Sequence, residues 1–305
     1  MTPPLILGGN VFGWTADRAV SHAILDAFVA GGGTMIDTAD SYSSWVPGNS
    51  GGESESIIGD WLAARGRRDD VVIATKVGAE VFGGKGLAPD RIRASVEGSL
   101  KRLRTDYIDL YFAHYDDPDT PFEATLEAFD ALVKAGKVRA IGASNHTAER
   151  LREALDISAA HSLAPYTVLQ PEYNLVARDS FEGPLQDLSV ERGIAAVPYF
   201  ALASGFLTGK YRGADDAAAR PRGGAVSKYL TDYGLGVLKA VDAVASDVGA
   251  TPAQVSLAWL AAQPAVTAPI ASATRVAQVD ELLGAMRLTL TPDHLARLDT
   301  ASRRA

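Results

Sequence analysis

Short apolar runs alternate with longer segments of helical periodicity along almost the whole chain. The helical segments carry apolar residues on one face; Ile92, Val96, Leu100 and Leu103, for example, are spaced at i, i+4, i+8 and i+11. Such alternation is typical of parallel β/α units. The runs with the character of buried strands are LILGG (5–9), TMID (34–37), VVIATK (71–76), YIDLYFAH (107–114), RAIGASN (139–145), TVLQPEYN (167–174), IAAVPYF (194–200) and VTAPIASA (266–273).

Several helix boundaries can be predicted from local signals. Thr120, Pro121 and Glu123 predict a capping box with proline at the first helical position. Thr147 is expected to cap the helix after the fifth run. A long polar insertion, residues 211–232, interrupts the alternation before the last helices.

Eight β/α units in 305 residues fit a (β/α)8 TIM barrel better than a doubly wound sheet. No internal repeat and no linker divides the chain. We therefore expect residues 1–305 to form a single barrel domain, with its active site at the C-terminal rim of the strands.

Composition narrows the class of protein. With 47% hydrophobic residues the chain can bury a large core, and its net charge of −8 argues against a nucleic-acid-binding face. The absence of cysteine excludes disulfides and sulfur-ligated metals, and the five isolated histidines form no metal motif. The N-terminus lacks the features of a signal peptide, and no run is long enough to span a bilayer. We expect a cytoplasmic protein without metal, membrane or nucleic-acid partners.

Polar side chains stand where successive predicted strands end. In a closed parallel barrel these ends face one rim. Any one of the residues alone would more often be structural, but six at the same edge predict an active site. They are Asp37, Lys76, His114, Ser144, Asn145 and Gln170.

The chemistry these residues suggest is proton transfer to a carbonyl oxygen as hydride reaches its carbon. The phenol of Tyr42 is a weak acid unless its anion is stabilised, and a nearby Lys76 would stabilise it. Asp37 would hold Lys76 charged and oriented. His114 could donate to the carbonyl and fix its direction.

The residues at the next strand ends suit a cofactor. The hydroxyl and amides of Ser144, Asn145 and Gln170 suit a carboxamide such as that of nicotinamide, and Tyr199 offers a ring for stacking.

The chain resembles the aldo-keto reductase family from LGGNVFGW to its last predicted strand. The resemblance is carried by IDTADSY with GESE (52–55), ATK, FAHYDDPDTPFEATLEAFDALVKAGKVRAIGASN, LQPEYN and PIASATRVAQVDE, in that order. It implies a catalytic tetrad of Asp37, Tyr42, Lys76 and His114, with Tyr42 as general acid. It also implies a nicotinamide site at Ser144, Asn145, Gln170 and Tyr199.

The same resemblance places the rest of the cofactor on two later segments. Arg275 beside two hydroxyl groups suits a 2′-phosphate, which favours NADPH over NADH. The chain departs from the family in having Ser272 where glycine is frequent and Leu282 where asparagine is frequent. The remaining cofactor-binding residues implied are Leu202, Ser204, Gly205, Lys210, Ser272, Thr274, Arg275, Gln278 and Glu281.

Substrate contacts are expected from three loops, 43–52, 77–89 and 211–232. Trp45, Phe82 and Tyr115 are candidates for the pocket wall, although aromatic residues in loops can also serve packing alone.

The leading hypothesis is an NADPH-dependent reductase of an aldehyde, ketone or sugar-like carbonyl. One alternative is a cofactor-binding regulatory subunit resembling potassium-channel β-subunits. A barrel isomerase or lyase that uses Lys76 as a Schiff base ranks last, because a lysine beside a carboxylate and a phenol is a poor free amine. The oligomeric state is open, with a monomer favoured.

Overall fold

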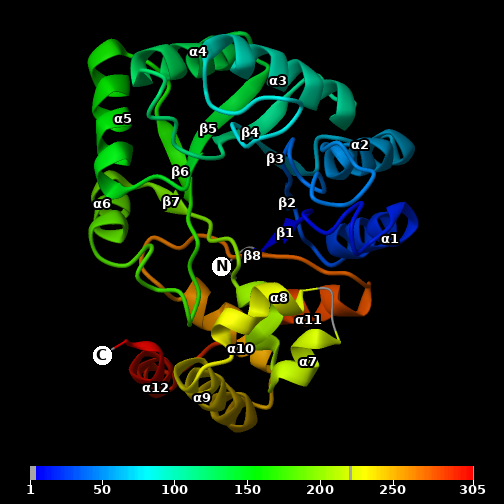
Figure 1. The fold of residues 1–305 in the computed structure, drawn as a ribbon, viewed down its shortest axis with the longest axis vertical. Coiled ribbons are helices and arrows are strands. Elements are labelled where there is room, and N and C mark those ends of the chain that lie inside the picture. Colours follow the sequence, from blue (N-terminus) through cyan, green and yellow to red (C-terminus); the bar gives the residue numbers. More distant parts are fainter. Residues whose placement is uncertain (1–4, 220–221, 305) are drawn as a thin grey trace.

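A single parallel sheet organises the computed structural model, which describes residues 5–219 and 222–304. Within these residues eight strands pair in the order β7-β6-β5-β4-β3-β2-β1-β8 (Figure 1). Their bounds are β1 Ile6–Gly8, β2 Met35–Asp37, β3 Val72–Val77, β4 Ile108–Ala113, β5 Val138–Ser144, β6 Tyr166–Gln170, β7 Ala195–Ala196 and β8 Ile270–Ala271.

The two edges of the sheet meet through backbone hydrogen bonds. β1 pairs with β8, so that Leu7 lies opposite Ala271. After β7, the carbonyl of Pro198 accepts from the N–H of Ile270 at 2.9 Å, and the carbonyl of Ala196 accepts from Thr267 at 2.8 Å. These bonds leave neither edge open, and the predicted (β/α)8 barrel is confirmed.

Helices lie outside the strands, with α1 to α6 following the sheet around its outer face (Figure 1). The bounds are α1 Arg18–Ala30, α2 Glu53–Arg65, α3 Pro89–Leu103, α4 Phe122–Lys134, α5 Ala148–His161, α6 Pro184–Arg192, α7 Ala214–Ala218, α8 Gly223–Val226, α9 Asp232–Val248, α10 Pro252–Ala261, α11 Ala277–Ala285 and α12 Pro292–Ser302; the 3-10 helices are η1 Ala203–Thr208 and η2 Ser227–Tyr229.

The core has two parts because successive strand residues face opposite sides of the sheet. Outward residues such as Leu7, Ile73 and Tyr111 belong to the large cluster beneath the helices. The residues that alternate with them fill the inside of the barrel, which is packed with side chains rather than open. This inner cluster consists of Ile6, Ala74, Leu110, Phe112, Val197, Ala268 and Ile270.

The predicted capping box at Thr120 is wrong. The Thr120 hydroxyl donates to Asp117 Oδ2 at 2.7 Å, and the helix α4 begins after Pro121 without a side-chain cap. Asp117 also accepts from the N–H of Leu87 at 2.7 Å. The hydroxyl therefore helps to hold a loop rather than the helix end. The cap predicted at Thr147 is confirmed by its hydrogen bond from the N–H of Arg150.

The polar insertion is not a bare loop. It contains α7, α8 and η2, and the long helix α9 begins at its end; the sequence prediction did not include these elements. Residues 220 and 221 of the insertion lie outside the described residues, as do residues 1–4 of the N-terminal segment. In the described part of the chain, no helix is both long enough and apolar enough to cross a membrane.

Candidate active site

The predicted tetrad meets at the carboxyl ends of β2, β3 and β4. Lys76 Nζ lies at the centre and donates to Asp37 Oδ2 at 2.7 Å and to the Tyr42 hydroxyl at 2.8 Å. A third donation, to the backbone oxygen of Thr38 at 2.7 Å, uses its remaining N–H. Because Lys76 is fully buried and Asp37 is 2% exposed, this ion pair has little freedom to rearrange.

The Tyr42 hydroxyl also donates to Asp37 Oδ2, at 3.2 Å. Its pKa stands well above the usual value, first because the group is buried and then because the Asp37 carboxylate lies beside it. Burial lowers the pKa of Lys76, and the charge of Asp37 opposes this effect. In the resting site, burial and Asp37 thus outweigh the influence of Lys76, and Tyr42 keeps its proton at neutral pH.

His114 completes the cluster as a neutral imidazole. Burial, assisted by the charge of Lys76, places its pKa well below the usual value. Its ring meets that of Tyr42 edge-on at 6.1 Å and stacks on Tyr115 at 4.9 Å. Its Nδ1 is buried and has no hydrogen-bond partner among the described residues. A neutral imidazole in this setting has one N–H to offer to a ligand.

A second network joins the tetrad to the strands β5 and β6. Gln170 Nε2 donates to Asp37 Oδ1 at 2.8 Å, so both oxygens of Asp37 are engaged. Asn145 adopts a left-handed backbone (φ +56°), a conformation that asparagine tolerates better than most residues. Its amide donates to the backbone oxygen of His114 at 2.9 Å, and its Oδ1 accepts from the Tyr199 hydroxyl at 2.8 Å. These polar groups are held at fixed positions beside the tetrad.

A long cleft of about 780 Å³ runs across the rim from the tetrad to the segment after β8. All of the predicted cofactor residues line it: Ser144, Asn145, Gln170, Tyr199, Leu202, Ser204, Gly205, Lys210, Ser272, Thr274, Arg275, Gln278 and Glu281. At the far end, Gln278 Oε1 accepts from the N–H of Thr274 at 2.8 Å. The guanidinium of Arg275 is exposed and forms no ion pair with any acidic side chain in the described ranges.

The middle of the cleft is formed by strained backbone. Phe200, Ala203, Ser204 and Gly205 all have φ between +49° and +97°. A Cβ atom on Gly205 would lie 3.0 Å from Lys210 Nζ, so this position brings backbone close to the lysine. Strained backbone of this kind clusters at ligand-binding segments, where the surrounding structure holds it in place.

The three aromatic residues predicted for the substrate wall differ in their position relative to the cleft. Trp45 and Tyr115 line the cleft and are about half exposed, at 49% and 50%. Phe82 is not among the lining residues: its ring lies 5.0 Å from the guanidinium carbon of Arg102 on α3, and its place in the wall stays a prediction. Trp14 is not a lining residue but packs edge-on against Trp45 at 5.8 Å.

Sequence reasoning missed several cleft residues. Arg222, in the polar insertion, places its guanidinium 5.3 Å from the ring of Trp14, and its Nη2 is buried without an acceptor among the described residues. Asn10 accepts from the Ser272 hydroxyl at 2.6 Å. Asn10 lies within the LGGNVFGW segment but was not assigned a role, and Arg222 belongs to no motif. The fold brings both residues to the cleft. The other cleft residues missed include Thr15, Phe200, Thr208 and Tyr211.

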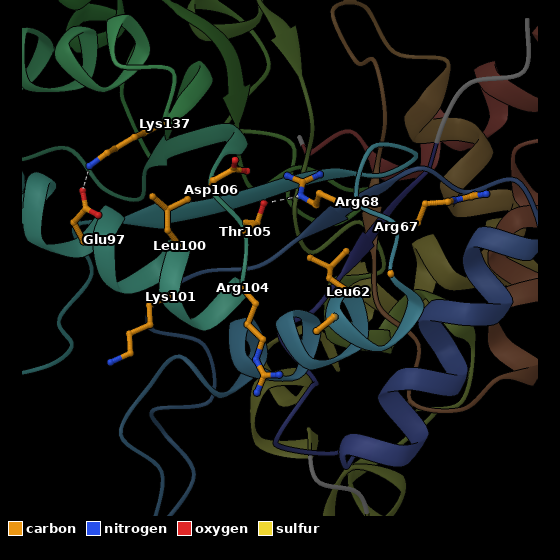
Figure 2. Close-up of a pocket in the computed structure, with 12 residues that line it drawn as sticks. Leu62, Arg67, Arg68, Glu97, Leu100, Lys101, Arg104, Thr105, Asp106 and Lys137 are labelled. Atoms are coloured by element: carbon orange, nitrogen blue, oxygen red, sulfur yellow. Dashed lines mark hydrogen bonds and ion pairs between the residues drawn. The ribbon is translucent and has the colours of Figure 1, made fainter.

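A second hollow, of about 800 Å³, lies at the opposite end of the barrel, where strands begin (Figure 2). Its lining is rich in basic side chains, but Lys137 pairs with Glu97, and Arg68 binds Asp109 at 2.6 Å. The hollow also adjoins the C-terminal ends of α2 and α3, where basic residues offset the helix dipoles. Ion pairs and helix ends thus account for most of the basic side chains of this hollow.

The C-terminal rim of the (β/α)8 barrel joins a buried Asp–Lys pair to a phenol and a neutral imidazole, a set of groups suited to acid–base chemistry. The chain belongs to the aldo/keto reductase family, whose model matches residues 4–303.

Three relatives illustrate the range of similar proteins. The protein Tas of Escherichia coli (strain K12) is 35% identical over 96% of this chain and 92% of its own length. The aldo-keto reductase str7 of Strobilurus tenacellus is 35% identical over 90% of this chain and 78% of its own. A probable voltage-gated potassium channel subunit beta of Oryza sativa subsp. japonica is 32% identical over 94% and 89%. The protein is accordingly an NAD(P)H-dependent oxidoreductase.

Proposed function

We propose that the protein is an NADPH-dependent reductase that converts an aldehyde, ketone or sugar-like carbonyl to the alcohol, with Tyr42 as the proton donor. The observation that carries the proposal is the position of the Tyr42 hydroxyl, 2.8 Å from Lys76 Nζ and 3.2 Å from Asp37 Oδ2 at the end of the cleft. Tyr42 is protonated there and has a cation in contact to stabilise the anion it would leave.

Each tetrad residue has a separate task. A nicotinamide bound in the cleft would supply the hydride. Tyr42 gives its proton to the carbonyl oxygen, and Lys76 stabilises the resulting phenolate. Asp37 keeps Lys76 charged and in place through the 2.7 Å ion pair. The neutral imidazole of His114 can donate to the substrate oxygen and fix its direction.

The donor set of the cleft suits the cofactor. Ser144, Asn145 and Gln170 place amide and hydroxyl groups beside the tetrad, where a carboxamide would need them. At the other end, the exposed Arg275 lines the cleft together with Ser272 and Thr274, a combination suited to a 2′-phosphate. Leu282 lines the cleft in place of the asparagine frequent in the family. Gln278 and Glu281 are therefore the residues proposed to make polar contacts with this end of the cofactor.

The regulatory-subunit alternative is not favoured, although one relative bears the name of a potassium channel subunit. The tetrad is assembled, which a purely binding role does not require. The Schiff-base alternative is weaker still, because all three N–H groups of Lys76 are engaged by Asp37, Tyr42 and Thr38. A single domain, a cytoplasmic location and a monomeric state stay predictions from the sequence.

The deciding experiment compares the parent protein with Tyr42→Phe. NADPH consumption is followed with a panel of activated aromatic and aliphatic aldehydes, and NADPH binding is measured separately by fluorescence. We expect parent turnover and a loss in Tyr42→Phe on the order of 10²- to 10⁴-fold, the usual contribution of a positioned general acid. Cofactor affinity is expected to stay within about twofold, because the phenylalanine keeps the ring.

Tyr107→Phe is the matched control, since it also removes a phenol hydroxyl but lies just before β4, at the opposite end of the barrel and outside the cleft. Its kcat is expected to stay near that of the parent. Tight NADPH binding without turnover of any carbonyl in the panel would instead support the binding-subunit alternative. An equal loss of kcat in both variants would show that Tyr42 is not the proton donor.

A further inference from the structure

Asp40 is a buried carboxyl group that the proposed mechanism does not use. It lies in the loop between β2 and Tyr42, its residue is 0% exposed, and its backbone N–H approaches the carbonyl of Lys76 at 3.4 Å. Neither carboxyl oxygen has a hydrogen-bond partner among the described residues. An ionised carboxylate without a donor is strongly disfavoured in such a place, whereas the neutral acid is tolerated.

The groups around Asp40 come from each element packed against it. They are Glu55 on α2, Lys76 on β3, Arg91 and Arg102 on α3, and Tyr111 on β4. Two carboxyl groups therefore share a buried site with three cations. Tyr111 is fully buried as well, its hydroxyl has no partner within the described ranges, and burial keeps its pKa well above the usual value.

None of the nearby cations forms a hydrogen bond with Asp40, and most of their N–H groups bind other acceptors. Arg102 Nε donates to Glu55 Oε2 at 2.6 Å, and the Thr75 hydroxyl donates to Glu55 Oε1 at 2.6 Å. Arg91 Nη2 donates to the backbone oxygens of Ala79 and Val81, whereas its Nε is buried and has no partner among the described residues. The three N–H groups of Lys76 donate to Asp37, to Tyr42 and to the backbone oxygen of Thr38.

Of the two buried carboxyl groups, Glu55 has a donor on each oxygen and is the one suited to carry the charge. Asp40 then holds a proton. Burial, followed by the negative charge of Glu55, raises its pKa to about 7, which agrees with the geometry and sets the pH at which the proton would leave.

We propose that Asp40 is a positioning residue that must be a neutral acid for carbonyl reduction, and that losing its proton slows the reaction by placing a second negative charge beside Lys76. This inference rests on the proposed function. The released proton goes to solvent. The new carboxylate competes with the Tyr42 phenolate for the stabilising charge of Lys76, so proton donation by Tyr42 becomes less favourable.

The test is the pH dependence of kcat for reduction, measured at saturating NADPH and aldehyde between pH 6 and 8.5. In the parent, kcat is expected to fall by a factor on the order of 3 to 10 around pH 7, the effect of one added charge on a neighbouring acid. Asp40→Asn keeps the shape of the side chain but cannot ionise. Its kcat is expected to stay level over the same range.

Asp130→Asn is the matched control for loss of a carboxylate. Asp130 is also buried, but it lies on α4 and binds the N–H of Ala164 at 3.1 Å, away from the cleft. This variant is expected to keep the fall in kcat near pH 7. If the kcat of Asp40→Asn also falls near pH 7 as it does in the parent, the proposal is wrong. A merely structural role for Asp40 would lower kcat at every pH without changing the profile.

A second measurement does not depend on the variant folding or on turnover. Carboxyl carbons of ¹³C-labelled aspartate are followed by NMR in the parent protein. One carbon titrating near pH 7, and missing from Asp40→Asn, supports the neutral acid; no titration between pH 6 and 8 overturns it. Such a carbon in a protein that reduces no carbonyl would defeat the proposed function while leaving the protonation of Asp40 supported.

Discussion

His114 and His146 are both held neutral by burial, one in the cleft and one behind it. The Nδ1 of His146 faces the backbone oxygen of Ser144 at 2.9 Å, and its Nε2 is buried without a hydrogen bond to any described residue. Desolvation lowers the pKa of each imidazole. Below about pH 6.5 the unfolded chain therefore binds protons at these histidines that the folded protein does not bind.

The free energy of unfolding is thus expected to fall as the pH drops through 6.5, by up to about 1.4 kcal/mol per pH unit for each such histidine. His114→Gln removes one of these groups, and its stability is expected to depend less steeply on pH. Urea unfolding at pH 7.5, 6.5 and 5.5 measures the difference. His161→Gln, at an exposed position on α5, serves as the control. Parallel curves for the parent and His114→Gln would contradict the prediction.

Three residues of the tetrad, Asp37, Lys76 and His114, were predictable because each ends a short apolar run, and Tyr42 because it follows Asp37 in the IDTADSY motif. Lys76 and Asp37 could be placed at one rim from the barrel alone. The pKa of Tyr42 was not predictable, since it depends on burial and on the angle at which Asp37 approaches. Arg222 gave no signal either, because a basic residue in a polar insertion normally faces solvent.

At the scale of elements, α9 contains two glycines that differ in what surrounds them. A Cβ on Gly234 would lie 2.0 Å from the backbone oxygen of Tyr229, at the end of η2. A Cβ on Gly236 would meet no atom within 4 Å. Close packing of the helix start on η2 therefore requires glycine at the first position and not at the second.

Gly234→Ala is expected to destabilise the protein by roughly 1–3 kcal/mol, since the new methyl group forces α9 away from η2. Gly236→Ala is expected to stabilise it by about 0.5–1 kcal/mol, because alanine restricts the unfolded chain and favours the helix. Thermal unfolding of the two variants beside the parent measures both effects. Shifts of the same sign would show that the two positions do not differ in packing.

The elements themselves were predictable to different degrees. Runs such as VVIATK stood out because both faces of a barrel strand are buried. The apolar positions Val237, Val241, Val244 and Ala245 of α9 could have revealed that helix, although the polar insertion before it obscured its start. β7 and β8 are only two residues long, and the hydrogen bonds that close the barrel between them depend on partners far away in the chain.

At the scale of the whole molecule, the cleft draws on distant parts of the chain. Gly8 and Asn10 meet Ser272, and the segment after β7 supplies the middle of the cleft. A ligand spanning the cleft would bind the folded protein and not the unfolded chain, because no local segment contains the site. Its binding therefore adds to the free energy of unfolding.

NADPH at about 100 times its dissociation constant is expected to stabilise the protein by about 2.7 kcal/mol. At the same concentration, NADH is expected to raise Tm less, because it lacks the phosphate proposed to meet Arg275. In Arg275→Leu the two cofactors are expected to give similar shifts. Differential scanning fluorimetry with both cofactors tests this, and a variant that still prefers NADPH would remove Arg275 from that role.

The pairing of β1 with β8 also has a consequence for the order in which the protein is made. A nascent chain that has been synthesised as far as His114 already contains Asp37, Tyr42 and Lys76. It still lacks the segment around Ser272 that pairs with its first strand. The four tetrad residues are thus translated well before the segment that completes the cleft. The site cannot be complete until the last part of the sequence has been synthesised.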